Sequence, residues 1–578
     1  MPSRTGAAHV VTTQRTYNGK VYRTHLLRRS YREDGKVKNE TLGNLSHLPE
    51  PLIHIIRRTL QGETFVPASQ AFEVVRSRPH GHVQAVALAM QRLGFASLLA
   101  SQPSGQRDLV LAMVASRIVN PDTKLATTRR WHCSTLAEEF GVAHADEDDL
   151  YAAMDWLLQR QDTIEQRLAS RHLAQGALVL YDLSSSWFEG STCPLARRGY
   201  SRDGRSGTLQ VNYGLLTDVR GCPVAVSVVE GNTADSLTFL PAVQRVRERF
   251  GLAQVVMVGD RGMMSHKAID ELRGQGGIDW ITALKSVSIR SLVEHGQLQL
   301  GLFDECNLAE ITSPDYPGER LVACRNDALA KLRAHKRESL LQATEELLAR
   351  VAASVQAGKL VGRDKIGLQV GKVVNRHKVA KHFELTIDDA GFSWSRRQDA
   401  ISAEAALDGL YIIRTSLDAQ RMDASQCVRS YKALSNVERA FRSLKTVDLK
   451  VRPIHHRLAD RVRAHILLCM LAYYVEWHMR EAWRELMFAD VDQATKATRD
   501  PVAPAQRSQA AQDKASSKQL DDGEPAHSFA TLLAEMATLV RNTCRAPDPQ
   551  AQAPHFDILT IATAHQQRAL NLIQAIKP

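Results

Sequence analysis

Two stretches of the sequence decide the fold: LVLYDLSSSWFEG at residues 178–190 and QVVMVGDRGMMS at residues 254–265. Each begins with a short apolar run, which is typical of a strand buried on both faces of a sheet. We expect the first strand to end at Asp182 and the second at Asp260. One such aspartate is most often a cap or turn residue. Two of them, on strands of one sheet, are expected to meet at its edge, where open α/β sheets bind ligands.

The segments around these stretches alternate between strand and helix patterns. We expect strands at 178–181, 209–217, 224–229, 254–259 and 279–284, and helices at 237–249 and 265–273. The order β-β-β-α-β-α-β predicts an α/β fold that starts as a meander and continues by alternation. We assign residues 176–285 to the first part of an α/β core.

The chain before this core divides into two regions. Residues 1–49 are expected to form a basic β-hairpin region, in which Val21–Tyr31 and Val37–Leu42 flank the turn Asp34-Gly35. Its arginines and lysines suit an arm that contacts phosphate groups, and a solvated hairpin explains them equally well. Residues 50–175 space their apolar side chains as helices do, and we assign them to a helical N-terminal DNA-binding domain.

The chain after residue 285 leaves the alternation and then returns to helices. A charged helix at 328–355 and β-type runs at 365–374, 383–387 and 410–415 predict an inserted β-rich subdomain over 286–415. Residues 416–490 are expected to complete the core, and the polar composition of 491–527 predicts a flexible linker. Two amphipathic helices predict a C-terminal helical region over 528–578, which is a candidate for dimerisation.

A third carboxylate stands in the stretch YKALSNVERAFRSLK at 431–445, which has the pattern of an amphipathic helix. Its apolar stripe consists of Leu434, Val437, Phe441 and Leu444. Tyr431, Glu438 and Lys445 are spaced seven residues apart, so that they share another face. That face suits a metal site beside a phosphate backbone, but a solvated Glu–Lys face has the same spacing.

Composition narrows the function classes. The formal net charge of +11 suits a polyanionic partner such as nucleic acid. The eight cysteines include no Cys-x-x-Cys pair, which argues against a zinc ribbon and for reduced thiols in a cytoplasmic protein. The longest apolar run, at 465–477, is too short to span a bilayer, so no membrane role is expected.

The motifs of three other enzyme classes are missing from the sequence. No Walker loop or G-x-S-x-G elbow occurs, and Asp182-Leu183-Ser184 lacks the second aspartate of haloacid-dehalogenase-type phosphatases.

The stretches YDLSSSWFEG, EGNTADSLTF, VGDRGMMS and YKALSNVERAFRSLK together resemble the DDE transposases of bacterial insertion sequences. More narrowly, they resemble the long, insertion-bearing members of the "IS-four" superfamily, from about residue 17 to residue 474. That superfamily carries a Tyr-x2-Arg-x3-Glu-x6-Lys helix, which Tyr431, Glu438 and Lys445 match. Leu434 stands where the arginine is expected, and Arg442 is a substitute cation one turn after Glu438.

The resemblance implies a ribonuclease H-like core with a β-rich insertion and helical N- and C-terminal regions. It implies Asp182, Asp260 and Glu438 as ligands of two Mg²⁺ ions, with Mn²⁺ accepted in their place. The partners implied are double-stranded DNA, as terminal inverted repeats and as target, and a second copy of the chain that pairs two ends. Tyr431 and Lys445 are expected to hold the DNA end. Trp394 is a candidate for stacking on a flipped base, although a tryptophan in this position more often packs within the insertion's own core.

Two other functions share this pattern. A transposase-derived protein that binds DNA without cutting it would be expected to lose a carboxylate, and none is lost. A ribonuclease H-like nuclease that does not join strands would share the core, although the helix that carries Tyr431 and Lys445 disfavours it.

Overall fold

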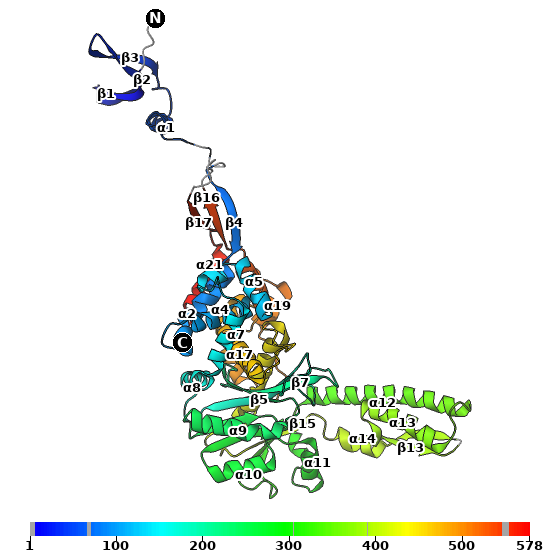
Figure 1. Cartoon of the computed structure of the whole chain (residues 1–578). Helices are drawn as coiled ribbons and strands as arrows, with labels where there is room; N and C mark the ends of the chain where they lie inside the picture. The colour runs from blue at the N-terminus through cyan, green and yellow to red at the C-terminus, as the bar shows by residue number, and fades with distance from the viewer. Residues whose placement is uncertain are drawn as a thin grey trace. The chain divides into compact units, whose positions relative to one another are not determined.

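The computed structural model describes residues 6–65, 67, 71–304, 306–389, 391–545 and 554–577 (Figure 1). The chain divides into two compact units. The first unit consists of Met1–Ser77 and Arg541–Thr560, and the second of Arg78–Val540 and Ile561–Pro578. Among the described residues, no helix combines the length and the apolar character that a membrane crossing requires.

The first unit is built from two small sheets. One is antiparallel and contains β1 (Ala8–Tyr17), β2 (Lys20–Glu33) and β3 (Lys36–Asn44), followed by α1 (Glu50–Leu60). The predicted hairpin is confirmed: Asp34 and Gly35 have φ of 48° and 74°, as a two-residue turn between twisted strands requires. Strand β1 was not predicted. The second sheet has the order β17-β16-β4 and joins β4 (Glu73–Pro79) to β16 (Val540–Arg545) and β17 (His555–Leu559).

The second unit is organised around one buried helix, α17 (Ala459–Ala482). Nearly every side chain from Val462 to Met479 is buried, and α17 packs against α4, α7 and β8. The apolar run at 465–477 therefore lies in the middle of a protein core. The surrounding helices are α2 (Gly81–Arg92), α3 (Phe95–Leu99), α4 (Gly105–Val119), α5 (Lys124–Arg130), α6 (Leu136–Glu139), α7 (Glu147–Leu158) and α8 (Gln161–His172).

The central sheet of the second unit is mixed. Its order is β11-β12-β15-β10-β9-β5-β7-β6, with β8 paired to β7, and β10, β9 and β5 are parallel. The strands are β5 (Leu178–Trp187), β6 (Arg197–Arg198), β7 (Leu209–Thr217), β8 (Pro223–Glu230), β9 (Val255–Gly259), β10 (Ile278–Ala283), β11 (Leu308–Ile311), β12 (Arg320–Arg325) and β15 (Leu410–Thr415). The helices are α9 (Phe239–Gln244), α10 (His266–Gln275) and α11 (Ser286–Glu294). The predicted order of strands and helices up to β10 is confirmed, with the short β6 added.

The insertion differs from its prediction. The segment 365–374, expected as a strand, lies in helix α13 (Arg363–His377), which packs against α12 (Asp327–Gln356). Ile366, Val370, Val373 and Val374 are buried there. Their spacing is that of one helix face, and this spacing outweighs the β-propensity of valine. The predicted runs at 383–387 and 410–415 are strands: β13 (Phe383–Ile387) pairs with β14 (Phe392–Arg396), and β15 belongs to the central sheet with β11 and β12. The described residues between β12 and β15 are otherwise mainly helical, in α12, α13 and α14 (Gln398–Ala405).

The predicted flexible linker at 491–527 is also wrong. It contains α18 (Gln493–Thr498) and α19 (Gln509–Ser517) and is fastened to the core. The Arg429 guanidinium donates to the Arg499 carbonyl at 2.9 Å, and the Ser508 hydroxyl donates to Asp490 at 2.7 Å. The polar composition of the segment is thus satisfied by hydrogen bonds to the core. The predicted C-terminal helices are confirmed as α20 (Phe529–Met536) and α21 (Ala564–Gln574).

Helix α13 and the strand first expected at 365–374 predict different effects for two substitutions. Val370 is buried and Leu368 is 66% exposed. On a strand these two side chains would share a face, whereas on a helix they point apart. We expect Val370→Ala to cost roughly 1–3 kcal/mol of unfolding free energy, and Leu368→Ala to cost almost nothing. Thermal unfolding of both variants measures this, and equal losses would contradict the helix.

Candidate active site

The parallel pairing of β5 with β9 brings two of the predicted carboxylates together. Tyr181 is paired with Gly259, so Asp182 and Asp260 follow on neighbouring strands. Asp260 comes directly after β9, as predicted. Asp182 does not end its strand: β5 continues to Trp187. The reason is its other neighbour, β7, which goes on pairing with β5 beyond the point where β9 stops.

Glu438 reaches the same place from α16 (Leu434–Arg442). This helix packs against β5 through an apolar face that includes the buried Val437 and Phe441, and Glu438 stays exposed. Burial, with smaller contributions from the negative charges of Asp260 and Glu438, raises the pKa of Asp182 to about 7. The three carboxylates therefore interact electrostatically across three separate elements.

The predicted continuous helix at 431–445 is interrupted. It consists of α15 (Ala424–Lys432), α16 and a wider π-helical turn at Ser443–Val447. Tyr431, on α15, donates its hydroxyl to Asp260 Oδ1 at 3.3 Å. Burial, together with the Asp260 charge, raises the pKa of this phenol, which keeps it protonated as a donor. Leu434 packs against the main core, so its side chain is not available to replace the arginine of the related motif.

Asp235 is a fourth carboxylate that the sequence analysis missed. Its partner is Arg202, whose guanidinium forms an ion pair with it and also lies near Asp182. A Cβ placed on Gly262 would lie 3.8 Å from Asp260 Oδ2 and 4.0 Å from Asp235 Oδ2, so both oxygens face this glycine. The stretch EGNTADSLTF contains Asp235, but no spacing rule distinguished it from a surface aspartate.

Lys445 is paired with Asp203, a carboxylate outside the predicted three. Its ammonium donates to Asp203 Oδ1 at 2.9 Å and is buried, and Arg452 forms an ion pair with the same carboxylate. The Trp187 amide donates to Asp203 Oδ2 at 3.0 Å, which fixes the loop to the end of β5. A cavity of about 300 Å³ opens here, lined by Trp187, Asp203, Arg205, Lys445, Thr446, Lys450 and Arg452.

A second, larger cavity of about 560 Å³ shares Lys450 and Arg452 with the first. Its cationic and histidine lining also includes Arg117, Lys124, His455, His456, Arg457, Arg461 and His465. Lys124 is only 5% exposed, and no carboxylate among the residues that the structure describes pairs with it. Burial, with the neighbouring Arg117 charge, lowers the pKa of Lys124 to about 7. A buried cation without a counter-charge is costly, and an anionic ligand in this cavity would remove that cost.

The two remaining predicted residues lie elsewhere. Arg442 is exposed at the end of α16. Trp394, on β14, stacks on Phe392 with ring centroids 5.7 Å apart and packs in the separate apolar core of the insertion. Its position in this structure matches the packing interpretation.

Asp182, Asp260 and Glu438 fit the ions that the resemblance implies. They offer hard oxygen ligands, which Mg²⁺ prefers. Burial and the neighbouring charges of Asp260 and Glu438 raise the pKa of Asp182, and a bound cation would favour its ionised form.

Comparison with known proteins identifies two domains. Residues 189–475 match the family "Transposase DDE domain", a range that includes Asp260 and Glu438 and begins just after Asp182. Residues 10–68 match "IS1634 family transposase, N-terminal domain". Among solved structures, a piggyBac transposase synaptic complex with hairpin DNA is similar at 9% identity and a TM-score of 0.35, over 78% of this chain and 77% of that one. No curated protein matches.

The crowded carboxylates predict a gain in stability when one of them is neutralised. We expect Asp182→Asn, in metal-free buffer at pH 8, to raise the thermal midpoint by about 2–4 °C per kcal/mol of repulsion removed. Added Mg²⁺ should then stabilise the wild type but not the variant. Asp270→Asn, an exposed aspartate on α10, is the matched control and should change neither value. A destabilised Asp182→Asn protein would contradict the electrostatic description.

Proposed function

The chain belongs to the DDE transposases of insertion sequences, and we propose that it cleaves DNA at the terminal inverted repeats of its element and joins the freed 3′ ends to target DNA. The observation that supports this most directly is the convergence of Asp182, Asp260 and Glu438 from β5, β9 and α16. Residues on rigid elements of one core keep the fixed geometry that two-metal chemistry requires.

We assign the three carboxylates to two divalent cations, Mg²⁺ or Mn²⁺. When bound, such ions activate a water or a 3′-hydroxyl for in-line attack and stabilise the charge on the nonbridging and leaving oxygens. Tyr431 orients Asp260 through its hydrogen bond. The Arg202–Asp235 ion pair places a cation beside Asp182 without bringing its full charge into the carboxylate cluster. Because Leu434 is apolar, Arg202 is our candidate for the charge that the motif arginine supplies in relatives.

The DNA backbone is assigned to the two adjoining cationic cavities. Lys450 and Arg452 line both of them, so one strand that passes Lys445 would continue towards Lys124. Phosphate contacts of this kind position DNA without reading its sequence. We propose that two copies of the chain pair the two element ends in the cytoplasm. Mass measurement with and without end DNA tests the pairing, and complexes that contain one copy only would exclude it.

The decisive experiment compares wild type with Glu438→Gln in Mg²⁺-dependent excision of a marker flanked by the element's terminal sequences. The substitution keeps the shape and removes the charge, so we expect excision to fall roughly a thousandfold or more. Glu271→Gln, an exposed glutamate on α10, is the matched control. Equal excision by Glu438→Gln and wild type would disprove the site. No excision by any protein, with end-specific binding intact, would favour a DNA-binding protein without catalysis, and cleavage without joining would favour a nuclease.

The cavity assignment predicts opposite effects on stability and on DNA affinity. Lys124→Met removes a buried charge that has no counter-charge, so we expect the free protein to become more heat-stable. If Lys124 contacts a phosphate, the slope of log affinity against log salt should become shallower by about one. Binding titrations at several salt concentrations measure this, with the exposed Lys267→Met on α10 as control. An unchanged slope would remove Lys124 from the DNA path.

A further inference from the structure

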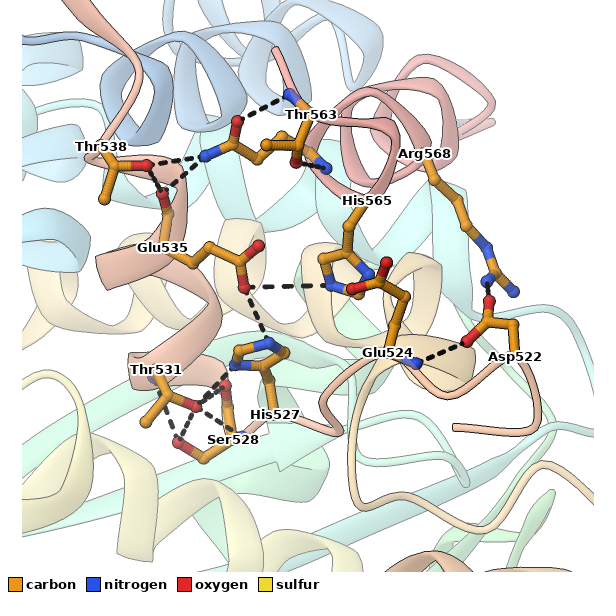
Figure 2. A network of polar contacts seen from close by, with 11 residues as sticks. Asp522, Glu524, His527, Ser528, Thr531, Glu535, Thr538, Thr563, His565 and Arg568 are labelled. Carbon is orange, nitrogen blue, oxygen red and sulfur yellow. Dashed lines mark hydrogen bonds and ion pairs between the residues drawn. The ribbon is translucent and has the colours of Figure 1, made fainter. Parts of the chain in front are cut away.

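The C-terminal part of the second unit contains a polar cluster that the proposed DNA chemistry does not use. His527 lies just before α20, Glu535 lies in the last turn of α20, and His565 lies in the first turn of α21. Figure 2 shows their side chains turned toward one another between these helices. Two segments of chain, 527–535 and the first turn of α21, thus supply two imidazoles and one carboxylate to one point.

The distances approach those of a metal site. His527 Nε2 lies 2.7 Å and His565 Nε2 lies 4.0 Å from Glu535 Oε2, and one ligand atom of each residue lies within 4.8 Å of the others. Ligands around a tetrahedral Zn²⁺ ion, with bonds of about 2.0–2.2 Å, are themselves about 3.3–3.5 Å apart. The His527–Glu535 distance of 2.7 Å is shorter than this spacing and the His565–Glu535 distance of 4.0 Å is longer. Rotations of the side chains are sufficient to reach it.

His565 lacks the hydrogen bonds that a buried imidazole needs. It is 5% exposed, and among the described residues neither of its ring nitrogens has a hydrogen-bond partner. Buried polar groups are nearly always satisfied, so an orphaned pair of ring nitrogens requires an explanation. Glu535 Oε2, at 4.0 Å, is too distant to supply it as a hydrogen-bond acceptor.

His527 is already oriented as a ligand would be. Its Nδ1 lies 3.3 Å from the hydroxyl of Thr531, which leaves Nε2 directed to Glu535. A ligating histidine commonly uses its second nitrogen in this way to fix the ring. The side chains of His527 and Glu535 are 12% and 28% exposed, so a fourth ligand from solvent has access.

We propose that His527, Glu535 and His565 bind one Zn²⁺-class cation that joins α20 to α21. Two imidazoles and one carboxylate suit Zn²⁺, whereas Mg²⁺ prefers oxygen ligands alone. The role is structural. The chain leaves this unit after α20 and re-enters it before α21, and the ion links the helices on either side of the intervening segment. The proposal does not depend on the DNA chemistry.

The test measures metal content and heat stability of the full chain after chelation and gel filtration. The measurement uses the double variant Asp182→Asn with Glu438→Gln, so that Zn²⁺ bound at the carboxylate site does not add to the measured zinc stoichiometry. We expect one equivalent of Zn²⁺ to bind and raise the thermal midpoint, and an excess of Mg²⁺ to do neither. His527→Gln and Glu535→Gln, both partly exposed and therefore tolerant positions, should each weaken zinc binding at least tenfold.

The control addresses the other buried cluster of this kind, His172, Cys222 and His478. In that cluster His172 Nε2 already has a partner, the Tyr474 hydroxyl at 3.1 Å. Cys222→Ser should leave the zinc stoichiometry and the midpoint shift unchanged. Failure of the double variant to bind Zn²⁺, or binding that is lost in Cys222→Ser and kept in His527→Gln and Glu535→Gln, would overturn the proposal.

Discussion

The parallel register between β5 and β9 is the constraint on which the site depends. It aligns Tyr181 with Gly259 and thereby places the next residue of each strand, Asp182 and Asp260, side by side. Helix α16 packs its apolar face on β5, and this packing brings Glu438 to the same site. A slip of one residue in this register would turn Asp182 to the opposite face of the sheet. The hydrophobic packing of β5 and β9, both almost fully buried, is what forbids that slip.

Charge in this core is arranged at a cost to stability. Burial, together with the charges of Asp260 and Glu438, raises the pKa of Asp182, and burial beside Arg117 lowers the pKa of Lys124. A buried ion pair occurs elsewhere in the same unit, where Arg245 lies 2.9 Å from the fully buried Glu165. Among the described residues, neither Asp182 nor Lys124 forms a close ion pair of that kind. We therefore propose that their counter-charges come from ligands, a cation for Asp182 and a phosphate group for Lys124.

The sequence predicted the elements whose patterns are local. The apolar runs before Asp182 and Asp260, the turn at Asp34-Gly35 and the helical stripe around Glu438 depend on neighbours along the chain, and these predictions agree with the structure. Prediction from the sequence failed where contacts between distant residues determine the local structure. Valine-rich 365–374 folds as a helix because α12 covers one face of it, and polar 491–527 is ordered by hydrogen bonds to distant residues. Asp203 and Asp235 were missed because their partners, Lys445 and Arg202, are identified only by the fold.

The sheet of β4, β16 and β17 takes its strands from the two ends of the chain. Strand β4 ends at Pro79 and β16 begins at Val540, so about 460 residues separate hydrogen-bonded neighbours. At 5–20 residues per second, a ribosome needs roughly 20–90 s to make that interval. Through that time β4 has no partner, and a nascent chain that stops early never acquires one. The first unit is therefore completed only after the central sheet of the second unit has been synthesised.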